Sequence, residues 1–177
     1  RTGLLAVLER MGAGVVRARV RDEGGEPVGD VTVTGPGRLR ACTIEPHEIP
    51  ALIDEIPAWA VAAALAQGTS RISGAGELRV KESGRRASLA ANLGRLGLEV
   101  EERADGFSIT GGPVRGGEVH AADDHRIAMA FALLGTRASG PVTVEGAGGI
   151  ATSFPGFAGT LAELGGDLVE TPPVGRP

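Results

Sequence analysis

The sequence predicts an α/β (α+β) domain in which a helix–strand unit occurs three times. Three segments share one design, an amphipathic helical pattern that ends at a glycine: residues 3–12, 88–97 and 159–165. Glycine commonly follows the last turn of a helix because it adopts positive φ without a steric penalty. The first two segments lead directly into β-type sequence, at residues 15–20 and 98–101. The unit is too long for a solenoid repeat, so we expect one domain with three related parts.

Two further helical segments are apolar nearly all round, which favours burial in the interior. The first, residues 57–67, is rich in alanine, begins with a proline suited to a first helical turn and is followed by Gly68. The second, residues 125–134, places its largest apolar side chains on one face. Short strands with one face exposed to solvent are expected at residues 31–34, 70–73, 107–110 and 142–145. Turns are expected at residues 111–113 and 116–117.

The length allows one ordinary domain or two very small ones, and we expect a single domain over residues 1–171, followed by a disordered tail at residues 172–177. The chain has 177 residues, 42% of them hydrophobic, but no tyrosine and one tryptophan, so small aliphatic side chains must fill the core. The chain begins at Arg1 and enters a helical pattern almost at once, and we therefore expect it to be a piece of a longer protein.

The charge and the few reactive side chains exclude several classes of function. A net charge of −4 gives no electrostatic reason to expect nucleic acid or a membrane surface as a partner. We find no apolar run long enough to cross a bilayer and no signal peptide. The single Cys42 excludes an intramolecular disulfide and fits a reducing cytoplasm, and the three scattered histidines give no reason to expect a structural zinc site.

The only lysine, Lys81, lies in the most charge-dense string of the chain, residues 77–86. Its ammonium group is a compact point charge, unlike the wide planar fork of the seventeen arginines. With Glu82 beside it and Arg85 four residues on, Lys81 is suited to holding an anionic substrate while a proton moves. A solvated turn that carries charges for solubility explains the same string equally well, and both interpretations stay open from composition alone.

The other charged or polar residues that suit chemistry also precede expected helices. Asp54 lies just ahead of Pro57, residues 123–124 are two aspartates before His125 and Arg126, and Thr152 precedes the last helix. A helix start carries unpaired N–H groups and a partial positive charge, which makes it a natural anion site. Taken singly, Asp124 and Ser153 are better explained as helix caps, and Ser83 is suited to cap the helix after Glu82. His125 alone is more often a first-turn residue without a chemical role.

Two strings of the sequence resemble a known family. Residues 78–85, Leu-Arg-Val-Lys-Glu-Ser-Gly-Arg, resemble one signature of the 5-enolpyruvylshikimate-3-phosphate synthase (3-phosphoshikimate 1-carboxyvinyltransferase) family, and residues 123–129, Asp-Asp-His-Arg-Ile-Ala-Met, look like the other. Residues 1–3 with the following helix, and residues 53–57, also fit, so the match covers nearly the whole chain in order. The resemblance implies an enolpyruvyl transferase-like fold with helices inside and sheets outside, and makes this chain the carboxy-terminal domain without its amino-terminal partner.

The chemistry that the resemblance implies is enolpyruvyl transfer from phosphoenolpyruvate to the 5-hydroxyl of shikimate 3-phosphate, with release of phosphate, in aromatic amino acid biosynthesis. It needs no metal and no organic cofactor, and glyphosate inhibits it by mimicking phosphoenolpyruvate. Because the cleft between two domains would form the site, we expect this chain alone to be inactive. The implied roles are acceptor and base for Asp54, substrate contact for Lys81, proton donor for Glu82, support of Glu82 for His125, and a phosphoenolpyruvate clamp for Arg85 and Arg126.

One position departs from the family pattern, and two other interpretations compete. Thr152 stands where many members have a lysine that contacts phosphoenolpyruvate, and a threonine donates a hydrogen bond but carries no charge. The sister family, which transfers the same group to UDP-N-acetylglucosamine, is the nearest alternative. The other is a non-catalytic repeat domain that acts as a scaffold, which requires the charged helix starts to face different directions instead of converging.

Overall fold

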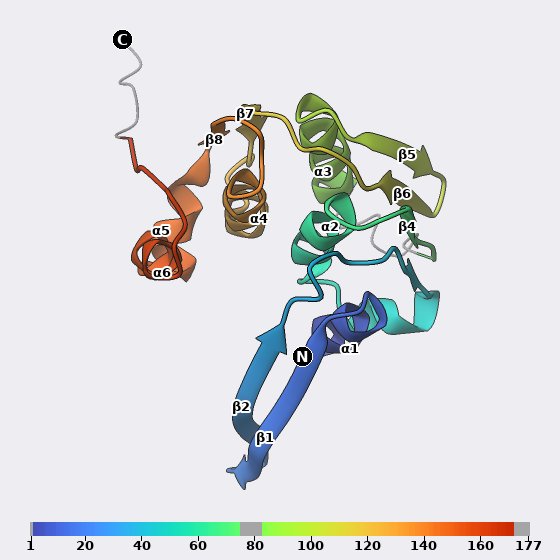
Figure 1. Ribbon diagram of the computed structural model, residues 1–177, viewed down its shortest axis with the longest axis vertical. Coiled ribbons are helices and arrows are strands. Elements are labelled where there is room, and N and C mark those ends of the chain that lie inside the picture. The colour runs from blue at the N-terminus through green and yellow to red at the C-terminus, as the bar shows by residue number, and fades with distance from the viewer. Residues whose placement is uncertain (1, 75–82, 172–177) are drawn as a thin grey trace.

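The computed structural model describes residues 2–74 and 83–171, so Lys81, Glu82 and the expected tail at residues 172–177 lie outside the described residues. Figure 1 shows the path of the chain. The helical segments are α1 (Gly3–Arg10), η1 (Pro46–Ala51), α2 (Ile56–Ala64), α3 (Ser83–Arg95), α4 (His125–Gly135), η3 (Ala147–Gly149), α5 (Ile150–Ser153) and α6 (Phe157–Glu163). The strands are β1 (Gly14–Glu23), β2 (Glu26–Thr34), β3 (Thr43–Ile44), β4 (Thr69–Ile72), β5 (Glu99–Arg103), β6 (Gly106–Thr110), β7 (Gly117–His120) and β8 (Val142–Glu145).

The strands pair in a pattern that confirms the repeated helix–strand unit. In the middle of the chain, four strands form a sheet in the order β3-β4-β6-β5, in which β3 and β4 are parallel and the other pairs antiparallel. The parallel pair β7–β8 repeats β3–β4, with α4 between its strands where α2 lies between the others. The antiparallel hairpin β1–β2 follows α1 as β5–β6 follows α3. Among the described residues, the middle copy therefore shows the full unit.

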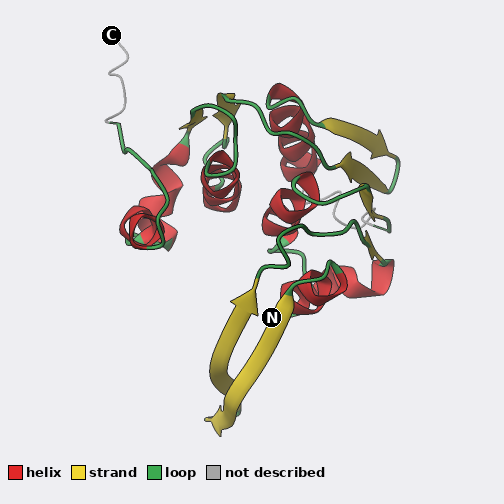
Figure 2. Cartoon of the chain, viewed as in Figure 1, coloured by secondary structure: helices red, strands yellow, loops and turns green. Residues whose placement is uncertain are grey.

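The core lies among the helices, with the four-stranded sheet and the pair β7–β8 beside them, whereas the hairpin β1–β2 extends away from the helices (Figure 2). Helix α2 contacts α3 and α4. Trp59 of α2 is fully buried and meets Phe107 of β6 edge to face, with ring centroids 5.7 Å apart. Helix α4 buries Ile127, Phe131 and Leu134. The expectation that the two apolar segments form buried helices is confirmed, and the small side chains of α2 allow its neighbours to approach closely.

The glycines that end the repeated helices take the predicted backbone conformation. Gly12, Gly97 and Gly165 have φ of 99°, 86° and 88°. At these values a β-carbon would be strained, so glycine is the residue that stops each helix and turns the chain.

Several boundaries differ from the predictions. Helix α3 begins at Ser83, five residues before the start of the predicted segment at Ser88, so Ser83 is its first residue and not the cap before it. The residues from 83 to 86 carry no large apolar side chain, so they showed no helical pattern. Helix α2 ends at Ala64, and Gln67 instead donates its backbone N–H to Leu39. Ser153 is the last residue of α5 and does not cap the final helix, which begins at Phe157 after Gly156. Pro155 disfavours helical geometry at the residue before it, which explains why α5 stops there.

Two short strands were not predicted. Strand β3 has only two residues, and β7 starts at Gly117, where the sequence indicated a turn. The two residues of β3 are too few to display the alternation that identifies a strand, and the glycine pair at residues 116–117 concealed the start of β7. No helix within residues 2–74 and 83–171 combines the length and apolar content required to cross a bilayer.

Candidate active site

The site is built around the first turn of α4. Asp124 is the N-cap of this helix, and its Oδ1 accepts hydrogen bonds from the backbone N–H groups of Arg126 (2.9 Å) and Ile127 (3.3 Å). The predicted cap is thereby confirmed. The two residues before it, Ala122 and Asp123, have positive φ of 51° and 60°, a conformation that non-glycine residues rarely adopt. Strained backbone of this kind persists where the surroundings hold it, which is common at functional sites.

Arg85, in the first turns of α3, reaches the other oxygen of the same cap. Its Nε donates to Asp124 Oδ2 at 2.7 Å, and the side chains of Arg85 and Asp124 are only 18% and 22% exposed. Burial on its own raises the pKa of Asp124, but the hydrogen bond and charge of Arg85 and the two backbone N–H donors outweigh it and hold this pKa below its usual value. The carboxylate therefore stays ionised and orients the guanidinium of Arg85.

Arg126 joins the start of α4 to the loop before α2. Its Nη1 donates to the backbone oxygen of Asp54 at 3.0 Å, and its Nη2 lies 3.5 Å from Asp54 Oδ2. Asp54 stands in the turn between η1 and α2, 72 residues away in sequence. Both side chains are largely shielded from solvent, with 34% of Arg126 and 22% of Asp54 exposed. The contacts between Arg126 and Asp54 hold the Asp54 carboxylate, which belongs to the middle repeat, next to α4 of the following repeat.

Asp124 contacts Arg85 and the backbone of Arg126, and Arg126 contacts Asp54. The structure thus brings Asp54, Arg85 and Arg126 together at the start of α4. His125 is the first residue of α4 and is partly buried. Thr152 is exposed on α5, which contacts α4. The approach is close, since a β-carbon added at Gly149 would stand 3.5 Å from His125 Cβ. Lys81 and Glu82 lie outside the described residues, and α3 begins directly after them.

Sequence reasoning missed one residue that holds this site, Asn92 of α3. It is 1% exposed, its Nδ2 donates to the backbone oxygen of His120 at 2.8 Å, and its Oδ1 accepts from the backbone N–H of His120 at 3.1 Å. These two hydrogen bonds fix the end of β7, four residues before Asp124. Asn92 lies two turns along α3 from Arg85. A polar residue within the apolar stripe of Leu89, Leu93 and Leu96 is the signal that could have identified it.

The chemistry of this arrangement favours anions. Two guanidinium groups stand at the start of a helix, where backbone N–H groups and the helix dipole add positive potential. Planar guanidinium binds carboxylate or phosphate through paired hydrogen bonds. A carboxylate beside them, that of Asp54, can accept a proton from a bound hydroxyl group. The positive groups make this cluster a poor place for a metal cation.

Comparison with solved structures first defines the class of fold. The chain superposes on the EPSP synthase of Acinetobacter baumannii with a TM-score of 0.86 and 38% identity, over 92% of this chain and 38% of that one. It also superposes on the enolpyruvyl transferase NikO from Streptomyces tendae with a TM-score of 0.71, over 96% of this chain and 36% of that one. At 21% identity this second likeness concerns the fold alone. The chain has the enolpyruvyl transferase fold.

The sequence comparisons are more specific. Residues 1–161 match the sequence model of the family described as EPSP synthase (3-phosphoshikimate 1-carboxyvinyltransferase), and the chain belongs to that family. It is 48% identical to the 3-phosphoshikimate 1-carboxyvinyltransferase of Halorhodospira halophila, over 93% of this chain, and 47% identical to that of Xanthomonas euvesicatoria, over 97% of it. These alignments cover 37% and 38% of the two relatives, so the chain spans little more than a third of their length.

Proposed function

We propose that this chain forms one side of the active site of a 3-phosphoshikimate 1-carboxyvinyltransferase. The observation that carries the proposal is the convergence of Asp54 and Arg85, from the middle repeat, on Arg126 and Asp124 of the next. Charged helix starts that face different directions would have favoured a scaffold. Two arginines and a carboxylate gathered at one helix start instead match a reaction in which an anionic donor meets a hydroxyl acceptor.

Asp54 acts on the acceptor in this proposal. Its carboxylate accepts the proton of the 5-hydroxyl of shikimate 3-phosphate, while that hydroxyl oxygen bonds to the central carbon of phosphoenolpyruvate. The contacts from Arg126 to both the backbone oxygen and the carboxylate of Asp54 hold the base in one place. A base is effective only within hydrogen-bond reach of its proton, so this positioning contributes directly to the rate.

Glu82 and Lys81 complete the reacting groups. Glu82 protonates the methylene carbon during the addition, and it takes a proton back from that carbon when phosphate leaves the tetrahedral intermediate. Lys81 follows the negative charge on the reacting oxygens, a task that suits a compact ammonium group. His125 supports Glu82. These roles rest on the family resemblance, because both signature residues lie outside the described part of the chain.

Arg85 and Arg126 bind phosphoenolpyruvate. Asp124 orients the guanidinium of Arg85 through its Nε, and Asp54 does the same for Arg126. Preorganised cations of this kind stabilise charge that develops during transfer and need little reorganisation. Thr152, on the neighbouring α5, contributes a hydroxyl group and no charge, which weakens binding of phosphoenolpyruvate and of glyphosate relative to members with a lysine.

The rest of the enzyme supplies the other side of the site. The chain corresponds to 37% of its Halorhodospira halophila relative, and we assign most contacts to shikimate 3-phosphate to the part that it does not match. Closure of two such domains expels water from the reacting groups. The chain alone is then inactive. The net charge of −4 gives no electrostatic reason to expect nucleic acid or a membrane surface as a partner, and we assign the enzyme to the cytoplasm.

The test is phosphate release from phosphoenolpyruvate, with the chain produced together with the part of the Halorhodospira halophila relative that it does not match. We expect release with shikimate 3-phosphate and none with UDP-N-acetylglucosamine. Release only with the nucleotide sugar would reassign the chain to the sister activity. Release with neither acceptor, from a complex shown to be folded, would favour the scaffold. Turnover by the chain alone would contradict the two-sided site.

A further inference from the structure

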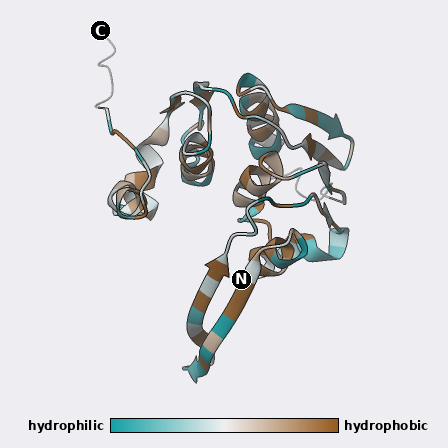
Figure 3. Cartoon of the chain, in the orientation of Figure 1, coloured by the Kyte–Doolittle hydropathy of each residue, from teal (hydrophilic) through white to brown (hydrophobic). Residues whose placement is uncertain are grey.

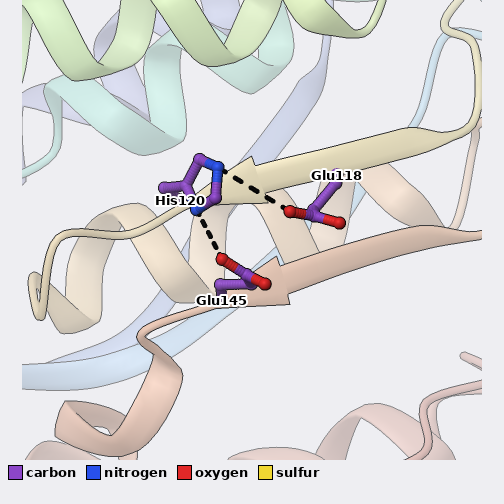
Figure 4. A group of neighbouring side chains, drawn as sticks. All are labelled: Glu118, His120 and Glu145. Atoms are coloured by element: carbon purple, nitrogen blue, oxygen red, sulfur yellow. Dashed lines mark ion pairs between the residues drawn. The ribbon is translucent and has the colours of Figure 1, made fainter.

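Three side chains that suit a metal ion gather on the solvent-facing side of β7 and β8, apart from the cluster at the start of α4. His120 of β7 stands opposite Glu145 of β8 in the parallel register, and Glu118 precedes His120 by two residues on β7. Because side chains two apart on a strand point to the same face, Glu118 and His120 share the outer face, while Val119 between them is fully buried. Figure 4 shows the imidazole between the two carboxylates.

The imidazole lies within reach of both carboxylates. Its Nδ1 lies 2.7 Å from Glu145 Oε2 and its Nε2 lies 3.8 Å from Glu118 Oε1. One ligand atom from each of the three residues falls within 4.8 Å of the others. One ion bound to all three at about 2.0–2.2 Å requires the exposed imidazole to turn, so that one of its nitrogens faces the ion together with the two carboxylates.

The backbone under these side chains is held firmly. Asn92, itself buried, binds both the N–H and the C=O of His120, and the parallel pairing aligns His120 with Glu145. The ligands therefore stand on strands and not on a mobile loop, which lowers the entropy lost when an ion binds. The three side chains remain 46% to 59% exposed, so an ion can reach them from solvent and keep bound waters as its other ligands.

We propose that Glu118, His120 and Glu145 form a binding site for one divalent transition-metal ion of the zinc class. An imidazole with two carboxylates suits zinc, copper, nickel and cobalt, whereas magnesium and calcium prefer oxygen ligands alone. The ion joins the end of β7 to the end of β8 just before the loop that carries Asp124 and the turn that leads to α5. It thereby stabilises the third repeat. The site departs from the expectation that the scattered histidines form no metal site, and it does not depend on the transferase proposal.

The test is a titration of the full 177-residue chain with Co²⁺, followed by visible absorption, and then displacement of Co²⁺ by Zn²⁺. The matched control is His47→Asn, because His47 also lies beside an acidic residue, Glu48. We expect one ion per chain for the wild type and for His47→Asn, and loss of the absorption bands in His120→Asn. Glu145→Gln should weaken Co²⁺ binding by at least about tenfold, because a neutral amide replaces one of the three ligands.

Two results would overturn the site. The first is unchanged Co²⁺ affinity in His120→Asn with a normal far-ultraviolet circular dichroism spectrum. The second is an equal loss of affinity in His47→Asn, which would indicate scattered surface binding. A rise in thermal midpoint with Zn²⁺, absent in Glu118→Gln, would support the role of the ion in joining the two strands, since an ion that binds only the folded state raises its stability.

Discussion

Two regions of the molecule are rich in ion pairs, and they use them differently. At the start of α4, Arg85 and Asp124 are 39 residues apart in sequence, and both side chains are mostly buried. On the β1–β2 hairpin, Arg21 pairs with Glu23 only two residues away, and both side chains are more than half exposed. A pair that is shielded from water interacts strongly and fixes distant parts of the chain, whereas an exposed pair is screened. Burial, and not the residue types, distinguishes the candidate site.

The apolar residues of the two regions also differ in how much of each side chain is exposed to solvent. Helix α4 buries Ile127 and Phe131, with 1% of each exposed. The hairpin leaves four valines between 50% and 64% exposed, and Figure 3 shows these hydrophobic stretches along its strands. The four are Val16, Val20, Val31 and Val33. Substitutions at the start of α4 should therefore change activity or stability, and those on the hairpin should change little.

The largest effect is expected for Glu82→Gln in the reconstituted transferase. Loss of a general acid that protonates carbon should lower kcat by about 10²–10⁴-fold, while the affinity for shikimate 3-phosphate stays nearly unchanged. Steady-state phosphate release and equilibrium binding separate the two quantities. Glu23→Gln on the hairpin is the matched control and should behave as the wild type. Near-normal turnover in Glu82→Gln would remove this residue from the mechanism.

The next effect concerns stability. Asn92→Leu leaves the backbone N–H and C=O of His120 without their buried partner, so the free energy of unfolding should fall by about 1–3 kcal/mol. Urea unfolding measures it. Thr32→Val on the exposed hairpin supplies the comparison and should change the same quantity by less than about 0.5 kcal/mol. If the two variants lose equal stability, Asn92 does not anchor β7.

A pH dependence should follow from the ion pair of Asp124. Its pKa is lowered on folding, so its charge contributes stability that is fully present above the ordinary value of 3.8 and is lost as the pH falls through the lower folded value. Asp124→Asn keeps a capping side chain but removes the charge. We expect the wild type to be more stable than this variant at neutral pH, with a difference that shrinks below pH 3.8. A difference that grows on acidification would contradict this sign.

The smallest effect is expected on the hairpin itself. Arg21→Gln removes an exposed pair between near neighbours, so the free energy of unfolding should change by less than about 0.5 kcal/mol. Raising the salt concentration should reduce even this difference because the charges are accessible to ions. A loss as large as that of Asn92→Leu would remove the distinction between the two regions.

Local patterns in the sequence predicted the elements that depend on local physics. Helical periodicity identified α2 and α4, the glycines at the ends of α1, α3 and α6 were placed correctly, and the cap by Asp124 followed from its position before a helix. Strand β3 was missed because two residues show no alternation, and β7 was missed because it starts in the glycine pair at residues 116–117, which indicated a turn. Their existence depends on partners supplied by other parts of the fold.

In the candidate site, too, the sequence identified individual residues but not the contacts between distant parts of the chain. The family strings nominated Asp54, Arg85 and Arg126, but no local pattern indicates that Arg126 reaches a carboxylate 72 residues away. That contact exists because two repeats dock through α2 and α4. The place of Asn92 within an apolar stripe indicates burial, but its partner lies 28 residues further on and no local pattern identifies it. The roles of Lys81 and Glu82 remain predictions of the resemblance.

The central claim is that the start of α4 binds the reacting groups, and the most direct measurement compares phosphate release by two reconstituted variants. Arg126→Gln removes a cation from the cluster, and Arg21→Gln removes the same charge from the hairpin. We expect kcat/KM for phosphoenolpyruvate to fall by roughly a hundredfold or more in Arg126→Gln and to stay at the wild-type value in Arg21→Gln. Equal rates in the two variants, both folded, would contradict the account.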